Sequence, residues 1–290
     1  MPNILKSTPR RLAKFPPPLA SKEYKVRSGD NWWNLASKYS RSDPWDIIEF
    51  NFRTRDPREV NWYLEFYVGC TSPASDGYNY RFDSADTPGI IYVPPTSWTP
   101  SVDLFLRRQV VGALSGPVTA RLNVNHAGYL ITGHTLAVIA NRVIDGEVGV
   151  VYDPKVGSGS AEYDSGTDTF HLGFAQATSK TKKGLIVHKA VHAALDLKVA
   201  STITIAESES LAYVVQCYYV RAYAADPTIE RLTSSNPLKD KVYEIAWDMA
   251  AHLEKGKQPS SVEWLALDHA VRRHPTYKKT AGKKAGFDGI

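Results

Sequence analysis

Three prolines within seven residues divide this chain more sharply than any other feature of its sequence. They lie in the segment Pro94-Pro95-Thr96-Ser97-Trp98-Thr99-Pro100. Proline lacks a backbone N–H and fixes φ, so neither a helix nor a central strand continues through such a segment. A chain of 290 residues is long enough for two ordinary domains, and we expect one body on each side of this segment. The expected divisions are a basic, proline-rich arm at 1–22, a small domain at 23–95, a linker at 96–102, a larger domain at 103–278 and a basic tail at 279–290.

The positive charge of the chain belongs to its two ends. Residues 1–27 hold seven Lys and Arg against one Glu, and residues 272–290 hold six against one Asp, which leaves 22 basic and 28 acidic residues between them. A pI near 9.0 would otherwise suggest nucleic acid, but a mildly acidic body predicts no specific nucleic-acid partner. The N-terminal arm is instead expected to dock on a secretion or tail-particle protein.

The sequence also limits where the protein works. No apolar run reaches eighteen residues, so we expect no membrane span. The N-terminus lacks the apolar core of a secretory signal, and Cys70 and Cys217 are too few for a disulfide framework. We therefore expect synthesis in the cytoplasm, and export, if it occurs, by a dedicated injection machine or in association with a particle.

The body before the proline segment is expected to contain a strand, two helices and a second strand. Tyr24-Lys25-Val26 reads as a short strand, and Gly89–Pro94 closes the body as another. Asp30 is placed to cap a helix over Asn31–Tyr39. Asp43-Pro44 supplies the cap and the first position of the next helix. These elements predict a small two-layer βααβ unit.

The spacing of residues in this body resembles that of a LysM domain. The matching positions are Tyr24-x-Val26-x-x-Gly29-Asp30, Leu35-Ala36, Trp45-x-x-Ile48-x-x-Asn51 and the strand that ends at Pro94. The resemblance implies a module that binds peptidoglycan or another N-acetylglucosamine glycan in a groove beside the first strand–helix loop. In this chain that loop is Arg27, Ser28, Gly29 and Asp30. Residues 69–88 are an insertion that either lines the groove or blocks it, and an adaptor role without a glycan is the alternative.

The larger body is expected to begin with strands and to end with helices. Glu147–Tyr152 and Thr169–Phe174 have strand patterns on either side of a loop rich in Gly, Ser and Asp. Helices are expected over Leu185–Leu197, Leu211–Ala225, Asp240–Glu254 and from the Ser260 capping box to Arg272. Strands followed by packed helices predict the α+β class.

One helix carries a candidate metal site. His188 and His192 stand four residues apart in an otherwise apolar helix, so both imidazoles project from one face. Glu209 begins the next helix, and a carboxylate there completes a two-His, one-Glu zinc site with an open fourth position. Asp196 lies one turn beyond His192 and is expected to accept a hydrogen bond from that ring. Glu207 is the alternative ligand, and a buried structural pair of histidines is the competing interpretation.

These residues resemble the zincin-like metallopeptidases, in which HExxH on one helix is joined by a Glu in an ExxA pattern on the next. The resemblance covers residues 145–225 and implies that His188, His192 and Glu209 bind zinc. It also implies that Thr169–Phe174 is an edge strand that precedes the active helix and receives an extended substrate.

Lys189 stands where that family has its catalytic Glu. In the peptidases the Glu takes a proton from zinc-bound water, which a charged lysine cannot do. Either Lys189 turns away and metal binds without peptidase chemistry, or it loses its proton and acts as an unusual base, or metal binding is lost. A substitution that is not native is a fourth explanation. We favour an inactive or altered site of peptidase ancestry.

Three functions are compatible with these features. The first is a peptidoglycan-targeted protein, in which a LysM domain delivers a zinc-metallopeptidase-like domain that Lys189 inactivates or alters. The second is a structural component of a phage-tail-like or contractile injection particle, with the zincin-like domain as a non-catalytic scaffold. The third is a glycan-binding protein with no second activity. Bound zinc separates the first two, and peptidoglycan binding separates the first and third from the second.

Overall fold

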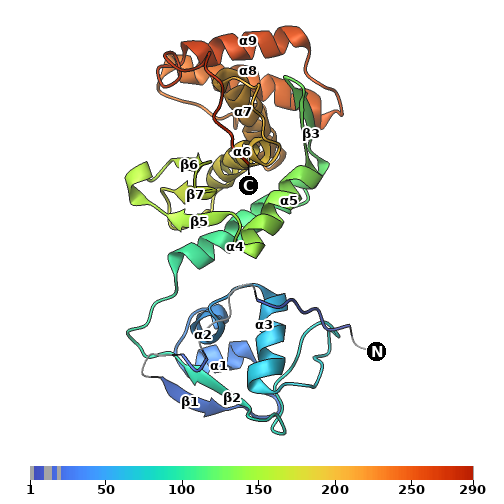
Figure 1. Ribbon diagram of the computed structural model, residues 1–290, viewed down its shortest axis with the longest axis vertical. Helices are drawn as coiled ribbons and strands as arrows, with labels where there is room; N and C mark the ends of the chain where they lie inside the picture. The colour runs from blue at the N-terminus through green and yellow to red at the C-terminus, as the bar shows by residue number, and fades with distance from the viewer. Residues whose placement is uncertain (1–2, 10–14, 18–20, 290) are drawn as a thin grey trace. The chain divides into compact units, whose positions relative to one another are not determined.

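The computed structural model describes residues 3–9, 15–17 and 21–289. The chain forms two compact units, Met1–Arg108 and Gln109–Ile290, with the division inside helix α4 (Val102–Leu114). Within the described residues, helices predominate over small sheets of two or three strands, which is the α+β class (Figure 1). No helix of this part of the chain has the length and apolar character that crossing a membrane requires.

In the first unit the helices lie, in sequence, between two strands that pair with each other. Strands β1 (Lys22–Lys25) and β2 (Ile90–Val93) are antiparallel, with Tyr24 opposite Ile91. Between them in sequence come α1 (Trp32–Lys38), α2 (Pro44–Phe52), α3 (Pro57–Tyr63) and a π-helical turn at Leu64–Val68. Asn51 joins α2 to β2, because its side-chain amide donates to the Tyr92 carbonyl and accepts from the Tyr92 N–H.

Helix α1 begins one residue later than expected. Asn31, not Asp30, is the N-cap, and its side chain forms a reciprocal capping box with Asn34. Asp30 instead stabilises the turn before the helix, because its carboxylate accepts hydrogen bonds from the Arg27 N–H and the Tyr24 hydroxyl. The prediction for α2 is confirmed, since Asp43 caps it with Pro44 in the first turn.

Both flanks of this unit pack against it. The Leu5 and Ser7 N–H groups donate to backbone carbonyls of Tyr78 and Arg58, and Phe15 contacts the Phe52 ring. The part of the N-terminal arm that the structure describes therefore lies on its own unit; residues 10–14 and 18–20 lie outside the description. The proline segment is also packed, because the Arg41 guanidinium donates to carbonyls of Pro94, Pro95 and Trp98.

The second unit begins with a two-stranded hairpin and a three-stranded sheet. The hairpin strands are β3 (Asn123–His126) and β4 (Tyr129–Thr132), and α5 (Gly133–Asp145) follows. The sheet has the order β5-β7-β6, with β5 at Gly149–Tyr152, β6 at Ala161–Asp164 and β7 at Thr169–Leu172. The expectation that Thr169–Phe174 is an edge strand is wrong. Strand β6 folds back as an antiparallel partner while β5 pairs in parallel on the other side, so β7 is central.

Four helices complete this unit: α6 (Lys180–Leu197), α7 (Ile205–Ala222), α8 (Pro237–Glu254) and α9 (Ser261–Arg273). The predicted Ser260 capping box opens α9. Helices α6 and α7 approach closely at Gly184, where an added Cβ would stand 2.6 Å from a methyl carbon of Val220. The segment after α9 returns to the start of α7, because backbone N–H groups of Ile205 and Ala206 donate to carbonyls of Lys283 and Ala281.

Candidate metal centre

His188, His192 and Glu209 converge between α6 and α7. The Nε2 atom of His188 lies 3.2 Å from Oε2 of Glu209, and the Nε2 atom of His192 lies 3.4 Å from Oε1. One candidate ligand atom from each residue lies within 4.8 Å of the other two. All three side chains are buried, with exposed fractions of 3%, 8% and 8%. This group of residues, called here the HHE cluster, can hold a metal ion.

The local helix structure explains why these side chains meet. Residues four apart lie on one face of α6, which brings the two imidazole centroids to 5.2 Å. Helix α7 begins with a capping box in which Glu207 accepts from the backbone N–H and hydroxyl of Thr204. Glu207 is therefore used by the cap and is not a ligand, while Glu209, two residues on, faces α6.

The sides of the imidazoles away from Glu209 are also bound. Nδ1 of His188 is hydrogen-bonded to the Gln216 side chain at 3.0 Å, and Nδ1 of His192 shares a hydrogen bond with the Ser208 hydroxyl at 3.0 Å. Such contacts orient a metal-binding histidine and fix its tautomer. The Tyr277 hydroxyl donates to Oε2 of Glu209 at 2.9 Å.

Sequence patterns missed Gln216, Ser208 and Tyr277 as partners of the cluster. Gln216 lies on α7 seven residues, about two turns, after Glu209, so the 3.6-residue period was a usable signal for it. Ser208 is the residue before Glu209, and helical spacing does not place it on the same face. Tyr277 is 68 residues away from Glu209 in sequence, and no periodicity identifies it.

Asp196 does not play the expected role. Its Oδ2 accepts from the Tyr163 hydroxyl at 2.8 Å, and its Oδ1 accepts from the backbone N–H groups of Asp288 and Gly289. His192 uses Ser208 instead. The reason is the tertiary position of the C-terminal segment, which brings two N–H donors to a fully buried carboxylate that requires them.

Burial and neighbouring charge set the protonation of the cluster. Burial is the main cause that lowers the pKa of both histidines, and Lys189 adds to it. Burial acts to raise the pKa of Glu209, but the Lys189 charge and the two imidazoles outweigh it, so the net pKa lies far below the ordinary value. Neutral imidazoles facing an ionised carboxylate are the protonation states in which these side chains bind metal.

The hydrogen bonds of the cluster leave room for a cation. His188 has a hydrogen-bond partner at each ring nitrogen, Gln216 at Nδ1 and Glu209 at Nε2. Nε2 of His192 is buried without a hydrogen-bond partner. A ring nitrogen without a hydrogen-bond partner, beside an ionised carboxylate in a buried site, is suited to bind a cation. Separations of 3.2 and 3.4 Å also fit two ligands on one tetrahedral zinc, whose bonds are about 2.0–2.2 Å long.

Lys189 lies on α6 beside the cluster and is half-buried. No hydrogen bond or ion pair joins its ammonium group to another residue that the structure describes. Its charge nevertheless lowers the pKa of His188 and of Glu209. The positive charge of Lys189 therefore acts electrostatically on the cluster and disfavours a second cation there.

The loop expected to bind glycan is tied to the insertion. The Ser28 N–H donates to the Ser84 hydroxyl at 2.9 Å, and the Ser84 N–H donates to the Ser28 hydroxyl at 3.1 Å. Of the expected loop, Asp30 lines the cavity described next, and Arg27, Ser28 and Gly29 are not among the residues that line it. Ser28 and Ser84 are both exposed, so the insertion is bonded to the loop and does not bury it.

The same insertion lines a cavity of the first unit. The cavity has a volume of about 350 Å³ and lies among α1, the start of α2, α3 and residues 74–82. Its aromatic lining residues are Trp32, Trp33, Trp45, Tyr80 and Phe82, and its polar ones include Asp30, Asn31, Asp76 and Asn79. Trp33 is 69% exposed, which leaves a flat apolar face free at the rim. We call this the aromatic cavity.

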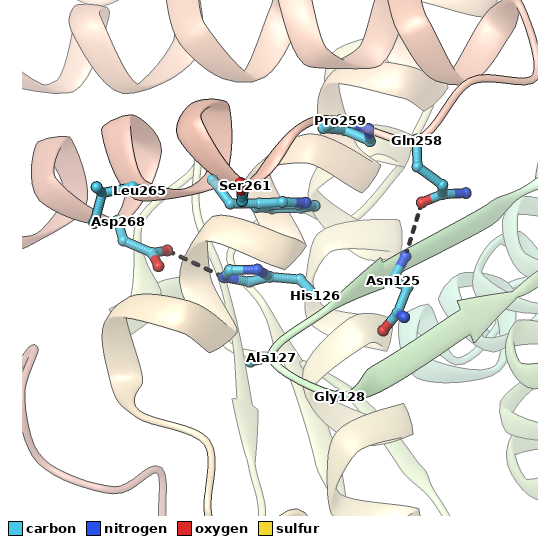
Figure 2. Close-up of a pocket in the computed structure, with 10 residues that line it drawn as sticks. Asn125, His126, Ala127, Gly128, Gln258, Pro259, Ser261, Leu265 and Asp268 are labelled. Atoms are coloured by element: carbon cyan, nitrogen blue, oxygen red, sulfur yellow. Dashed lines mark hydrogen bonds and ion pairs between the residues drawn. The ribbon is translucent and has the colours of Figure 1, made fainter.

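A further cavity of about 510 Å³ lies in the second unit, between the β3–β4 hairpin and α9. Figure 2 shows the His126 ring directed at Asp268, with an Nε2–Oδ1 distance of 3.2 Å, and Gln258 bonded to the backbone of Asn125. The His126 ring also stacks on Trp264 at 3.9 Å. His126 is therefore engaged by Asp268 and Trp264, and Gln258 by the hairpin backbone.

No protein-family model, curated protein sequence or solved structure matches the chain. The HHE cluster and the aromatic cavity are therefore the two candidate sites from which a function is inferred.

Proposed function

We propose that the second unit binds a divalent metal ion, with zinc as the physiological choice, through His188, His192 and Glu209. The observation that carries the proposal is the unpartnered Nε2 of His192 beside the ionised Glu209 carboxylate in a buried site. Two imidazoles and one carboxylate are a common protein ligand set for zinc that keeps one coordination position open. Gln216 and Ser208 hold the imidazoles with Nε2 toward the shared centre.

The residues around the cluster indicate what this centre does not do. Zinc in such a site supplies Lewis-acid chemistry to a bound water or carbonyl. Lys189 adjoins the site as a cation, and a cationic ammonium group cannot accept a proton as the peptidase Glu does. Tyr277 offers only a hydroxyl, whose pKa burial and Glu209 raise far above neutrality, so it stays protonated and donates to the carboxylate. We propose a metallopeptidase-like domain that binds zinc without peptide hydrolysis.

Zinc titration of the purified full chain tests this proposal. Competition against a chromophoric chelator is expected to show one tight site, and His192→Ala and Glu209→Gln are expected to weaken it at least about a hundredfold each. His171→Ala is the matched control, since that imidazole lies on β7 and near Asp153. Equal zinc affinity in the native chain, His192→Ala and Glu209→Gln would reject the assignment.

We propose as a second function that the first unit binds a neutral glycan, such as a chain with N-acetylglucosamine, in the aromatic cavity. Indole faces beside amide and carboxylate groups suit a sugar ring, because its C–H face is apolar and its edge carries hydroxyls. The two units would then form a glycan-targeted protein with a metal centre. Peptidoglycan is the expected target.

Chemical-shift perturbation with N-acetylglucosamine oligomers tests the glycan proposal. Trp33→Ala is expected to weaken binding about tenfold or more, because it removes the exposed stacking face. Phe66→Ala is the matched control, since Phe66 is an exposed aromatic residue of the same unit outside the cavity. An absence of shift changes at millimolar oligomer would leave the first unit as an adaptor.

A further inference from the structure

The segment after α9 packs beside the start of α7 and reaches the HHE cluster. After a turn through residues 281–283, Lys284 is paired to Thr204 in an antiparallel bridge beside the start of α7. The Ile205 N–H donates to the Lys283 carbonyl, and the Ala285 N–H donates to the Ile203 carbonyl. We call residues 281–289 the strap.

The distal part of the strap reaches the cluster itself. The Phe287 ring stacks on the imidazole of His192, with centroids 6.3 Å apart and planes 30° apart. The next two backbone N–H groups, of Asp288 and Gly289, donate to Oδ1 of Asp196 at 2.8 and 2.9 Å. Asp196 lies on α6 one turn after His192. Phe287 is thus held over the ring by an anchor on the same helix.

We propose that the strap is a closing element that controls the passage of metal ions and small ligands to the HHE cluster. The inference rests on the metal site proposed above and adds its regulation. Two features indicate that the strap closes and opens. Phe287 of the strap stacks on His192, the ligand whose Nε2 is buried and without a hydrogen-bond partner. Five of its nine residues are nevertheless exposed, and an isolated bridge joins it to the start of α7 in place of a paired strand. A segment with so few attachments opens at a lower free-energy cost than the core helices.

The Asp196 anchor gives the strap a defined closed position. A buried carboxylate needs donors, and the N–H groups of Asp288 and Gly289 supply two of them beside the Tyr163 hydroxyl. The bonds of Lys283 and Ala285 to the start of α7 fix the other end. Opening releases the bonds to Asp196 and moves Phe287 away from His192, while α6 and α7 stay folded.

The test uses the full chain and two strap variants. Phe287→Ala removes the ring over His192, and Ala285→Pro removes the N–H that bonds Ile203. Lys284→Ala is the matched control in the strap, because it changes an exposed side chain and leaves the backbone bonds intact. The measurements are the rates of Zn²⁺ uptake and of Zn²⁺ loss to excess chelator, and the rate at which diethyl pyrocarbonate modifies His192 in metal-free protein.

A controlling strap predicts that uptake and loss both accelerate about tenfold or more in Phe287→Ala and Ala285→Pro, while the zinc dissociation constant changes less than about threefold. Modification of His192 accelerates by a similar factor, and Lys284→Ala matches the native chain. Unchanged rates in both variants, or equal acceleration in the control, would overturn the strap. If no variant binds zinc, the metal proposal fails, and the His192 modification rates still decide whether the strap closes the cluster.

Discussion

Replacing Lys189 by glutamine removes the positive charge nearest to the HHE cluster and is expected to increase zinc affinity. Lys189 is half-buried, and its charge already lowers the pKa of His188 and Glu209. For a monovalent and a divalent cation roughly 8 Å apart, with an effective dielectric of about 40 for a half-exposed group, the repulsion is about 2 kcal/mol. Removal of the charge therefore tightens binding about 30-fold. Lys189→Glu reverses the charge and is expected to double this free-energy gain.

The assay is a competition titration with a chromophoric chelator at pH 7.5 and low salt, repeated at high salt. Added salt should reduce the difference between the native chain and the variants, because it screens a partly exposed charge. Lys183→Gln is the control, since it removes an equal charge from the same helix more than one turn before the cluster. If Lys189→Gln and Lys189→Glu fold normally and bind zinc no more tightly than the native chain, the electrostatic role assigned to Lys189 is wrong.

Three further predictions concern stability. In the metal-free protein both cluster histidines have lowered pKa values, so the unfolded chain binds more protons. The free energy of unfolding should therefore fall as the pH drops below about 6.5, by up to about 1.4 kcal/mol per pH unit for each ring, and equal urea midpoints at pH 7.5 and 5.5 would contradict this. Arg55→Ala should cost about 3–5 kcal/mol in urea unfolding, because Arg55 lies 2.7 Å from Glu49, which is completely buried. Arg58, whose side chain is 44% exposed in its pair with Asp56, is the control, and Arg58→Ala should cost less than about 1 kcal/mol. Gly184→Ala should destabilise the folded protein by about 1–3 kcal/mol and weaken zinc binding, because the added methyl group pushes α6 away from α7. Gly112 has open space around it, so the control Gly112→Ala should stabilise the protein by up to about 1 kcal/mol in thermal unfolding.

The sequence alone determined the features that depend on neighbours along the chain. The four-residue spacing of His188 and His192 placed both rings on one face, and the apolar character of that helix predicted its burial. The caps at Asp43 and Ser260 followed from local hydrogen-bonding chemistry. The α+β class followed from the order of the elements. These properties need only the period of a helix or strand and the residues at its ends.

Only the tertiary structure decided which distant groups complete the site. Thr169–Leu172 became a central strand because β6 and β5 both pair with it, and no strand pattern states how many neighbours a strand has. Asp196 accepts a hydrogen bond from the strap and not from His192. The Tyr277 hydroxyl donates to Glu209, which is 68 residues away in sequence. A buried carboxylate accepts whichever donors the packed chain brings near it. Those donors come from segments whose return to α6 and α7 depends on long-range packing, which is why local periodicity could not identify them.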